Sequence, residues 1–332
     1  MPRINKSELL HALAAAEASR PVHPGLGRVP PLTSPKLSAT QRALEQQLRP
    51  VLVKAGFKDR RFEDLRKQHD AELQRAAERE HSAAVRRSAK IRKTLRAGAA
   101  NRRRAAGTLA NLPVAPFLTI IDKPFLIWAK PRSGIIFDSQ IAPGDSWAKV
   151  KAVAGTGDKM YGSDNLSFYF LWDNPSDYYA VIDASTFITV NGFARAECDG
   201  GFWSGLDPQF SHYSYFSCQT YMTLWQWSDQ PPTPSVTASQ TVFTLNAEAG
   251  FFGDKKTTPV SGSFDHDYTH YVVNPRGVVV FEVVLAMNYS IYDGHILGDF
   301  AEGSFDISCP FMVVGLLSAP PVGPMATSTV TA

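Results

Sequence analysis

The sequence predicts a mainly β protein in which an antiparallel β-sandwich, of jelly-roll or immunoglobulin-like kind, follows a long basic α-helical arm. Three observations lead to this fold class. The spacing of hydrophobic residues changes from helical to alternating near Gly107, and all six Trp and all eleven Tyr follow that residue. Residues 1–107 carry 24 Lys or Arg against 10 Asp or Glu, whereas residues 108–332 carry 10 against 21. A basic arm therefore precedes an acidic, aromatic-rich body that can build a core.

Residues 1–37 contribute a short helix and a Pro-rich linker to the predicted organisation. The apolar run near the N-terminus is interrupted by His11 and Glu17, which favours a helix over a signal peptide. Five prolines in residues 20–37 favour an extended linker. No stretch approaches the roughly 20 apolar residues that a helical membrane span requires, and we expect a cytoplasmic protein.

Residues 38–107 form the predicted basic helical arm. Apolar or aromatic residues recur at helical spacing at Phe62, Leu65, His69, Leu73 and Ala76, and then more weakly at Ala83, Ala84, Ile91 and Leu95. A continuous helix from Lys58 to Arg96 would span about 39 residues and roughly 58 Å. Because its apolar stripe is thin, we expect this helix to lie on the body, to pair with a copy as a coiled coil, or to order on a partner.

Residues 108–318 form the predicted β-sandwich, and the tail at 319–332 is predicted to be disordered. Runs of β-branched and aromatic residues lie at 117–130, 164–173, 183–198, 212–227, 264–273 and 277–294, with no helical pattern between them. The last run is the clearest strand, because every second residue from Val279 to Ile291 is apolar. We expect its other face, which includes Glu282, to meet water.

No common catalytic motif occurs in the sequence. It contains no G-x-S-x-G elbow, no H-E-x-x-H, no Walker sequence and no Gly-rich dinucleotide turn. The sequence therefore favours a non-enzymatic protein without a cofactor. An enzyme with a site dispersed over loops is the weaker alternative.

The Cys and His residues do not predict a metal site. Cys198, Cys218 and Cys309 are odd in number and form no C-x-x-C pair, so we expect buried thiols and no disulfide framework. His266 and His270 share a strand face, but four residues along a strand place them about 13 Å apart. That separation is too large for both to chelate one ion directly. Packing within a polar strand is the expected role of both histidines.

One strand carries a row of aromatic residues that could form a ligand platform. Tyr213, Tyr215, Tyr221, Trp225 and Trp227 fall on a single face of the run at 212–227. If this face is exposed, it suits stacking on sugar rings, which makes a carbohydrate- or ligand-binding sandwich with a tethering arm one alternative function. If a second sheet or the arm covers it, the row is part of the core.

The basic run at 82–107 is the clearest functional signal, because it contains nine Lys or Arg residues and no Asp or Glu. These candidate polyanion-binding residues are Arg86, Arg87, Lys90, Arg92, Lys93, Arg96, Arg102, Arg103 and Arg104. They could complement the acidic body or an acidic protein surface, bind a polyanion such as nucleic acid, or contact a membrane surface.

The combination of arm and body favours an assembly or binding protein that forms a homo-oligomer or docks on an acidic partner. A basic arm joined to a β-sandwich resembles the architecture of small-virus coat proteins, although no coat-protein motif matches residue by residue. That resemblance makes a subunit that packages nucleic acid a further alternative.

Overall fold

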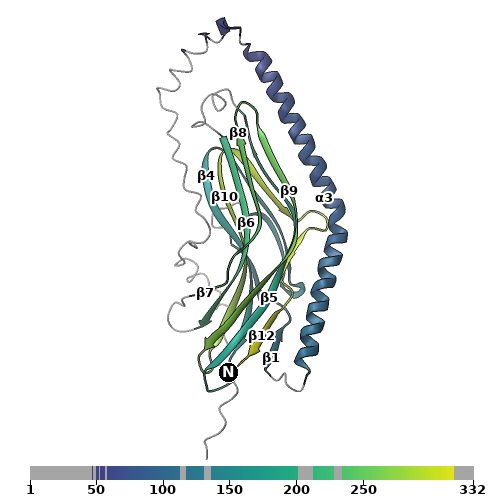
Figure 1. The fold of residues 1–332 in the computed structure, drawn as a ribbon, viewed down its shortest axis with the longest axis vertical. Helices are drawn as coiled ribbons and strands as arrows, with labels where there is room; N and C mark the ends of the chain where they lie inside the picture. Colours follow the sequence, from purple (N-terminus) through teal and green to yellow (C-terminus); the bar gives the residue numbers. More distant parts are fainter. Residues whose placement is uncertain are drawn as a thin grey trace, which may run out of the picture.

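The structure is a computed structural model that describes residues 58–112, 117–130, 136–200, 212–227 and 234–317, with a few positions between 47 and 56. The short helix and linker predicted within residues 1–37, and the tail at 319–332, lie outside the described residues. A long helix, α3 (Asp59–Ala110), precedes a body of antiparallel strands (Figure 1). The predicted fold class, a mainly β protein with an N-terminal helix, is therefore confirmed.

The described residues form twelve strands and one short 3₁₀ helix, η1 (Pro143–Asp145). The strands are β1 (Leu118–Ile121), β2 (Leu126–Lys130), β3 (Ile136–Ala142), β4 (Trp147–Asp173), β5 (Ala180–Cys198), β6 (His212–Trp227), β7 (Ser235–Val236), β8 (Gln240–Ala249), β9 (Asp254–Val273), β10 (Val278–Phe300), β11 (Asp306–Ser308) and β12 (Met312–Leu316). All their pairings are antiparallel.

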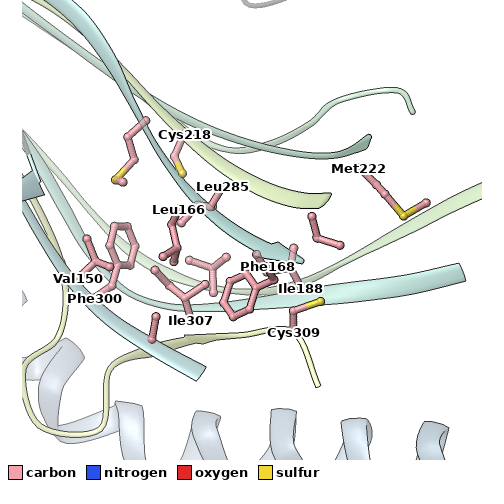
Figure 2. Close-up of a cluster of buried hydrophobic side chains, with 14 of the residues drawn as sticks. Val150, Leu166, Phe168, Ile188, Cys218, Met222, Leu285, Phe300, Ile307 and Cys309 are labelled. Atoms are coloured by element: carbon pink, nitrogen blue, oxygen red, sulfur yellow. The ribbon is translucent and has the colours of Figure 1, made fainter. Parts of the chain in front are cut away.

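Two layers of strands enclose the core. In one layer β10 lies between β4 and β6, with β2 and β3 paired to β4, and with β7 and β8 paired to β6. In the other layer β5 pairs with β9 and β12, and β1 extends the layer beyond β12. Figure 2 shows side chains from both layers turned toward one another, including Val150, Leu166, Ile188, Leu285 and Ile307. All five are fully buried, and the main core cluster to which they belong contains no residue of helix α3.

Strand β10 joins the two layers by changing its partner. It pairs with β6 as far as Tyr292 and with β5 from Gly294 onward. Between them Asp293 has a φ of 49°, and the register with β4 shifts at this point. The backbone packs so closely here that a Cβ on Gly294 would collide with Ser214 Oγ. The predicted end of the strand at Asp-Gly is therefore wrong, because this dipeptide forms a bulge inside a longer strand.

The two faces of β10 are both buried, whereas its alternating sequence predicts one buried and one exposed face. The apolar row from Val279 to Ile291 faces the core as expected. Glu282 on the other face was expected to meet water, but it is fully buried. The Tyr169 hydroxyl donates to Glu282 Oε1 at 2.9 Å, and the Thr223 hydroxyl donates to Oε2 at 3.1 Å. These two hydrogen bonds satisfy the carboxylate away from water.

Helix α3 lies along the outside of the body, on the side of β1, β5 and β9 (Figure 1). Its 52 residues correspond to about 78 Å, and it ends at Ala110 rather than near Arg96. The Ala- and Arg-rich sequence beyond Arg96 has high helix propensity, and no proline interrupts it before residue 113. Of the three expected placements, the structure shows the helix on the body. Among the described residues no helix is apolar enough over a sufficient length to span a membrane.

The predicted apolar stripe of the helix is partly wrong. Leu65 is 48% exposed, and Ala77, with 3% exposure, takes the buried position that was assigned to Ala76. Polar residues occupy inward positions that periodicity of apolar residues alone does not identify, such as the fully buried Ser88. Ser88 satisfies its hydroxyl by donating to Val85 O within the helix at 2.6 Å. Whether residues 108–318 fold without the helix stays a prediction.

Candidate functional site: the two faces of helix α3

The inward face of helix α3 contacts aromatic rings of the body near its start and at its middle. Near its start, the Phe62 ring lies 6.2 Å from Phe251 and 6.0 Å from Phe252. At the middle, Ala84 packs against Phe193 and Phe305. Both of these Phe side chains are essentially fully buried, so the helix covers apolar surface that the two sheets leave on the outside of the core.

Ion pairs to the body hold the next two turns of the inward face. Arg92 Nε and Arg96 Nη2 lie 3.0 and 3.2 Å from the same oxygen, Asp306 Oδ2. Asp306 is 4% exposed, and burial raises the pKa of its carboxyl above the usual range against the opposing effect of the two guanidiniums. The two arginines therefore partly offset the cost of burying this carboxylate. Both guanidiniums form ion pairs with the same oxygen of Asp306.

Two further arginines near the helix end also contact the body. Arg102 pairs with Asp265, and its guanidinium lies 4.5 Å from the centre of the Phe187 ring. Arg103 Nη2 lies 3.2 Å from Asp122 Oδ2 in a pair that is exposed on both sides. Four of the nine predicted polyanion-binding residues are therefore matched to acidic residues of the body.

The outward face of helix α3 carries a separate set of cations. At 100° per residue, six basic residues fall within an arc of about 60° that is opposite the buried face. They are Arg75, Arg79, Arg86, Lys90, Lys93 and Arg104, and each is exposed. We call this set the outward basic face. It extends over about 44 Å of helix, and within the described part of the chain none of its members forms an ion pair.

The structure thus divides the predicted basic run into two groups. Arg86, Lys90, Lys93 and Arg104 belong to the outward basic face, and Arg87 is exposed on its flank. Arg75 and Arg79 also belong to this face, but they lie outside the predicted basic run because Glu78 and Glu80 are close to them in the sequence. Helical spacing, rather than the absence of acidic residues, was the signal that could have found them.

The aromatic row on β6 is not an open platform. Tyr213, Tyr221 and Trp225 are 8%, 4% and 4% exposed, while Tyr215 and Trp227 are partly buried. Trp225 packs with Tyr169 and Val280, and the Tyr213 hydroxyl accepts a hydrogen bond from Ser290 at 3.4 Å. The burial of these residues therefore supports the alternative in which the aromatic row packs inside the protein.

The predicted packing role is supported for His266 and the predicted burial for the three cysteines, but His270 is not packed as expected. His266 is 1% exposed with Nε2 3.0 Å from Thr220 Oγ1, and burial lowers its pKa to about 4. His270 is exposed and has a φ of 61°. The three cysteines are free and buried, and burial raises the pKa of Cys198 and Cys309 to about 12 and that of Cys218 still further. Such thiols are poor nucleophiles.

The comparisons with known proteins do not show a family for this chain. No protein-family model matches the sequence, and no curated protein matches it. Among solved structures, TmCBM61 in complex with β-1,4-galactotriose is similar over 58% of this chain and 90% of its own, with 6% identity and a TM-score of 0.20.

Two further solved structures are similar at the same low level. A CBM4 structure covers 55% of this chain and 85% of its own at 12% identity and a TM-score of 0.13. The infectious bursal disease virus Gx strain structure covers 55% and 38% at 8% identity and a TM-score of 0.14. At these TM-scores the similarities carry no argument about function. The fold itself defines a β-sandwich protein with a docked N-terminal helix, which is consistent with a binding or assembly protein.

Proposed function

We propose that this protein is a non-enzymatic binding and assembly protein whose helix α3 binds nucleic acid through the outward basic face. The observation that carries the proposal is the division of charge on one helix. The inward arginines are matched to Asp306, Asp265 and Asp122, whereas the six outward cations have no acidic partner among the described residues. Unmatched cations along a rigid 44 Å line suit a linear polyanion.

The binding would depend on phosphates rather than on base sequence. Lys and Arg side chains on the outward face can displace the cations that condense on a nucleic acid, which makes the affinity strongly dependent on salt. The face contains no aromatic residue between Arg75 and Arg104, and Ser82, Ala89 and Ala97 lie between its cations. Nothing in this set is arranged to stack on bases or to read their edges, so we expect little sequence preference.

The other candidate functions have less support. Burial of Tyr213, Tyr221 and Trp225 removes most of the surface on which a glycan would stack. The buried cysteine thiols, with raised pKa values, do not favour covalent catalysis. An acidic protein and an anionic membrane surface are the other candidate partners of the outward basic face. If either is the natural partner, the protein should bind it more tightly than it binds nucleic acid.

A salt series tests the proposal directly. Fluorescence anisotropy would follow the full-length protein binding a labelled 30-base-pair DNA duplex and a 30-nucleotide RNA from 50 to 300 mM NaCl. If about five of the six cations contact phosphates, the slope of log affinity against log salt should be near −4.5 for the duplex and near −3.5 for the single strand. Two duplexes of unrelated sequence should bind equally.

Absence of measurable binding at 50 mM salt would contradict the proposal, as would an affinity for anionic vesicles or polyglutamate that exceeds the affinity for both nucleic acids. The assembly part has its own measurement. Light scattering should show a mass that increases with protein concentration, and a further increase on addition of nucleic acid. A mass of one chain at every protein concentration, together with complexes that hold a single chain per nucleic acid, would overturn the assembly part and leave only the binding function.

A further inference from the structure

Three side chains of metal-binding type meet where the middle of helix α3 contacts the turn after β10. His81 comes from the helix, Asp299 from the end of β10 and Glu302 from the turn that follows. One potential ligand atom from each lies within 4.8 Å of the other two. His81 Nε2 is 3.3 Å from Asp299 Oδ2 and 3.3 Å from Glu302 Oε2.

These two distances are long for direct hydrogen bonds, and they match the separation of two ligands of one metal ion. A hydrogen bond between a charged imidazole and a carboxylate is normally 2.7–2.9 Å long. Ligand atoms about 2.0–2.1 Å from a tetrahedral ion are instead about 3.3 Å from one another. The imidazole nitrogen is therefore placed as the ligand of an ion would be with respect to both carboxylates.

The surroundings fix the orientation of the three groups. Asp299 is 1% exposed, and its other oxygen, Oδ1, accepts hydrogen bonds from Ala301 N and Glu302 N at 3.0 Å each. These bonds leave Oδ2 directed at His81. The His81 ring packs at 4.8 Å from the Phe193 ring, edge to face, which restricts its rotation. Contacts that hold potential ligands in one orientation in this way are typical of sites that hold an ion.

We propose that His81, Asp299 and Glu302 bind a divalent cation of the zinc class, which fastens helix α3 to the body. One nitrogen and two carboxylate oxygens form a ligand set that zinc accepts, with a water molecule as the fourth ligand. The two carboxylates supply charge for the cation. This inference is independent of the proposed function, because the three residues lie on the inward side of the helix and none belongs to the outward basic face.

One nearby charge opposes the ion and provides a test. Lys151 Nζ lies 3.7 Å from Asp299 Oδ2, so its positive charge repels a cation at the site. Lys149 Nζ instead donates to the carbonyl oxygens of Ala301 and Gly303 at 3.0 and 2.7 Å. We therefore expect Lys151→Gln to bind zinc more tightly than the wild-type protein.

Isothermal titration calorimetry of the full-length protein, stripped with EDTA and titrated with ZnCl₂, is the main measurement. We expect one zinc per chain, and a rise in melting temperature of roughly 5 °C at a hundredfold excess over Kd. MgCl₂ at the same concentration should give neither effect, because Mg²⁺ demands oxygen ligands in octahedral geometry. Zinc should also slow tryptic cleavage within helix α3, because the ion joins the helix to the turn after β10.

Substitutions decide whether these three residues hold the ion. His81→Gln and Glu302→Gln should each weaken zinc binding at least tenfold, and Glu302 is exposed enough for its variant to fold normally. His69→Gln is the matched control, because His69 also links this helix to the body, at Gly253 O, but faces no carboxylate pair. Zinc binding that is undetectable in the wild-type protein, or unchanged in the His81→Gln, Glu302→Gln double variant, would overturn the proposal.

Discussion

The inward and outward faces of helix α3 use the same residue types for opposite purposes. Arg92 and Lys93 are neighbours in the sequence, yet Arg92 pairs with the buried Asp306 while Lys93 is exposed with no ion pair among the described residues. Arg103 and Arg104 divide in the same way at the helix end. The total charge of the basic run therefore does not define a binding surface. The binding surface is defined by the direction in which each side chain points from the helix axis.

Removal of the helix is the most severe perturbation of the inward face. Because the main core cluster contains no residue of α3, a fragment that begins at Thr108 should fold cooperatively. It should be less stable than the full chain by at least about 3 kcal/mol, since Phe193 and Phe305 become exposed. Limited trypsin digestion followed by thermal melting checks this. A fragment that melts without cooperativity would show that the helix belongs to the core.

Asp306→Ala should strongly destabilise the full chain. The substitution leaves Arg92 partly buried without its carboxylate, and breaking a buried pair costs about 3 kcal/mol at the lower end of the usual range. Urea unfolding measures the change in free energy. Asp177→Ala, which removes an exposed pair with Arg276, is the control and should change stability far less. Equal effects of the two substitutions would mean that the inward ion pairs do not hold the helix.

Acid should destabilise the body through the buried His266. The pKa of His266 is about 4 in the folded protein against 6.5 in the unfolded chain, so the unfolded state binds more protons between these values. Stability is therefore complete above pH 6.5 and should fall by up to about 3 kcal/mol as the pH decreases to 4. His266→Gln should remove this part of the pH dependence. An identical pH profile in the variant would refute the assignment.

A smaller contrast is expected from enlarging an alanine on each face. Ala84 is 7% exposed against Phe193 and Phe305, so Ala84→Leu should overpack the contact and cost about 1–3 kcal/mol. Ala97→Leu on the exposed face should change stability by no more than about 0.5 kcal/mol. Thermal melting of both variants makes the comparison. If Ala84→Leu is as stable as Ala97→Leu, the helix is not packed as described.

The sequence was sufficient to predict the fold class, but not the division of the helix surface. The change of hydrophobic period near Gly107 and the apolar row of β10 reflect local spacing, which a sequence records directly. Strand β4 was predicted only from Asp164 onward, because the three glycines before that residue, at 155, 157 and 162, are typical of turns. One of them, Gly155, faces His295 on β10, where a side chain would collide with the imidazole ring.

The sequence could not predict which charged residues, far apart in the chain, contact one another in the fold. Asp306 follows Arg92 and Arg96 by more than 200 residues, and nothing near these residues in the sequence predicts that they form ion pairs. The same limit applies to Glu282, whose burial depends on hydroxyls from two other strands. Arg75 and Arg79 differ from these cases, because their helical spacing with Arg86 and Lys90 was available in the sequence.

Two charge-matched triple variants test the contrast between the faces most directly. The outward variant changes Arg86, Lys90 and Lys93 to Gln, and the inward variant changes Arg92, Arg96 and Arg102 to Gln, so each removes three positive charges. The slope of log duplex affinity against log salt should fall in magnitude by up to about 2.7 for the outward variant and stay at the wild-type value for the inward one. The melting temperature should follow the opposite order. Equal changes of slope in the two variants would contradict the account, because binding would then depend on net charge and not on the face that carries it.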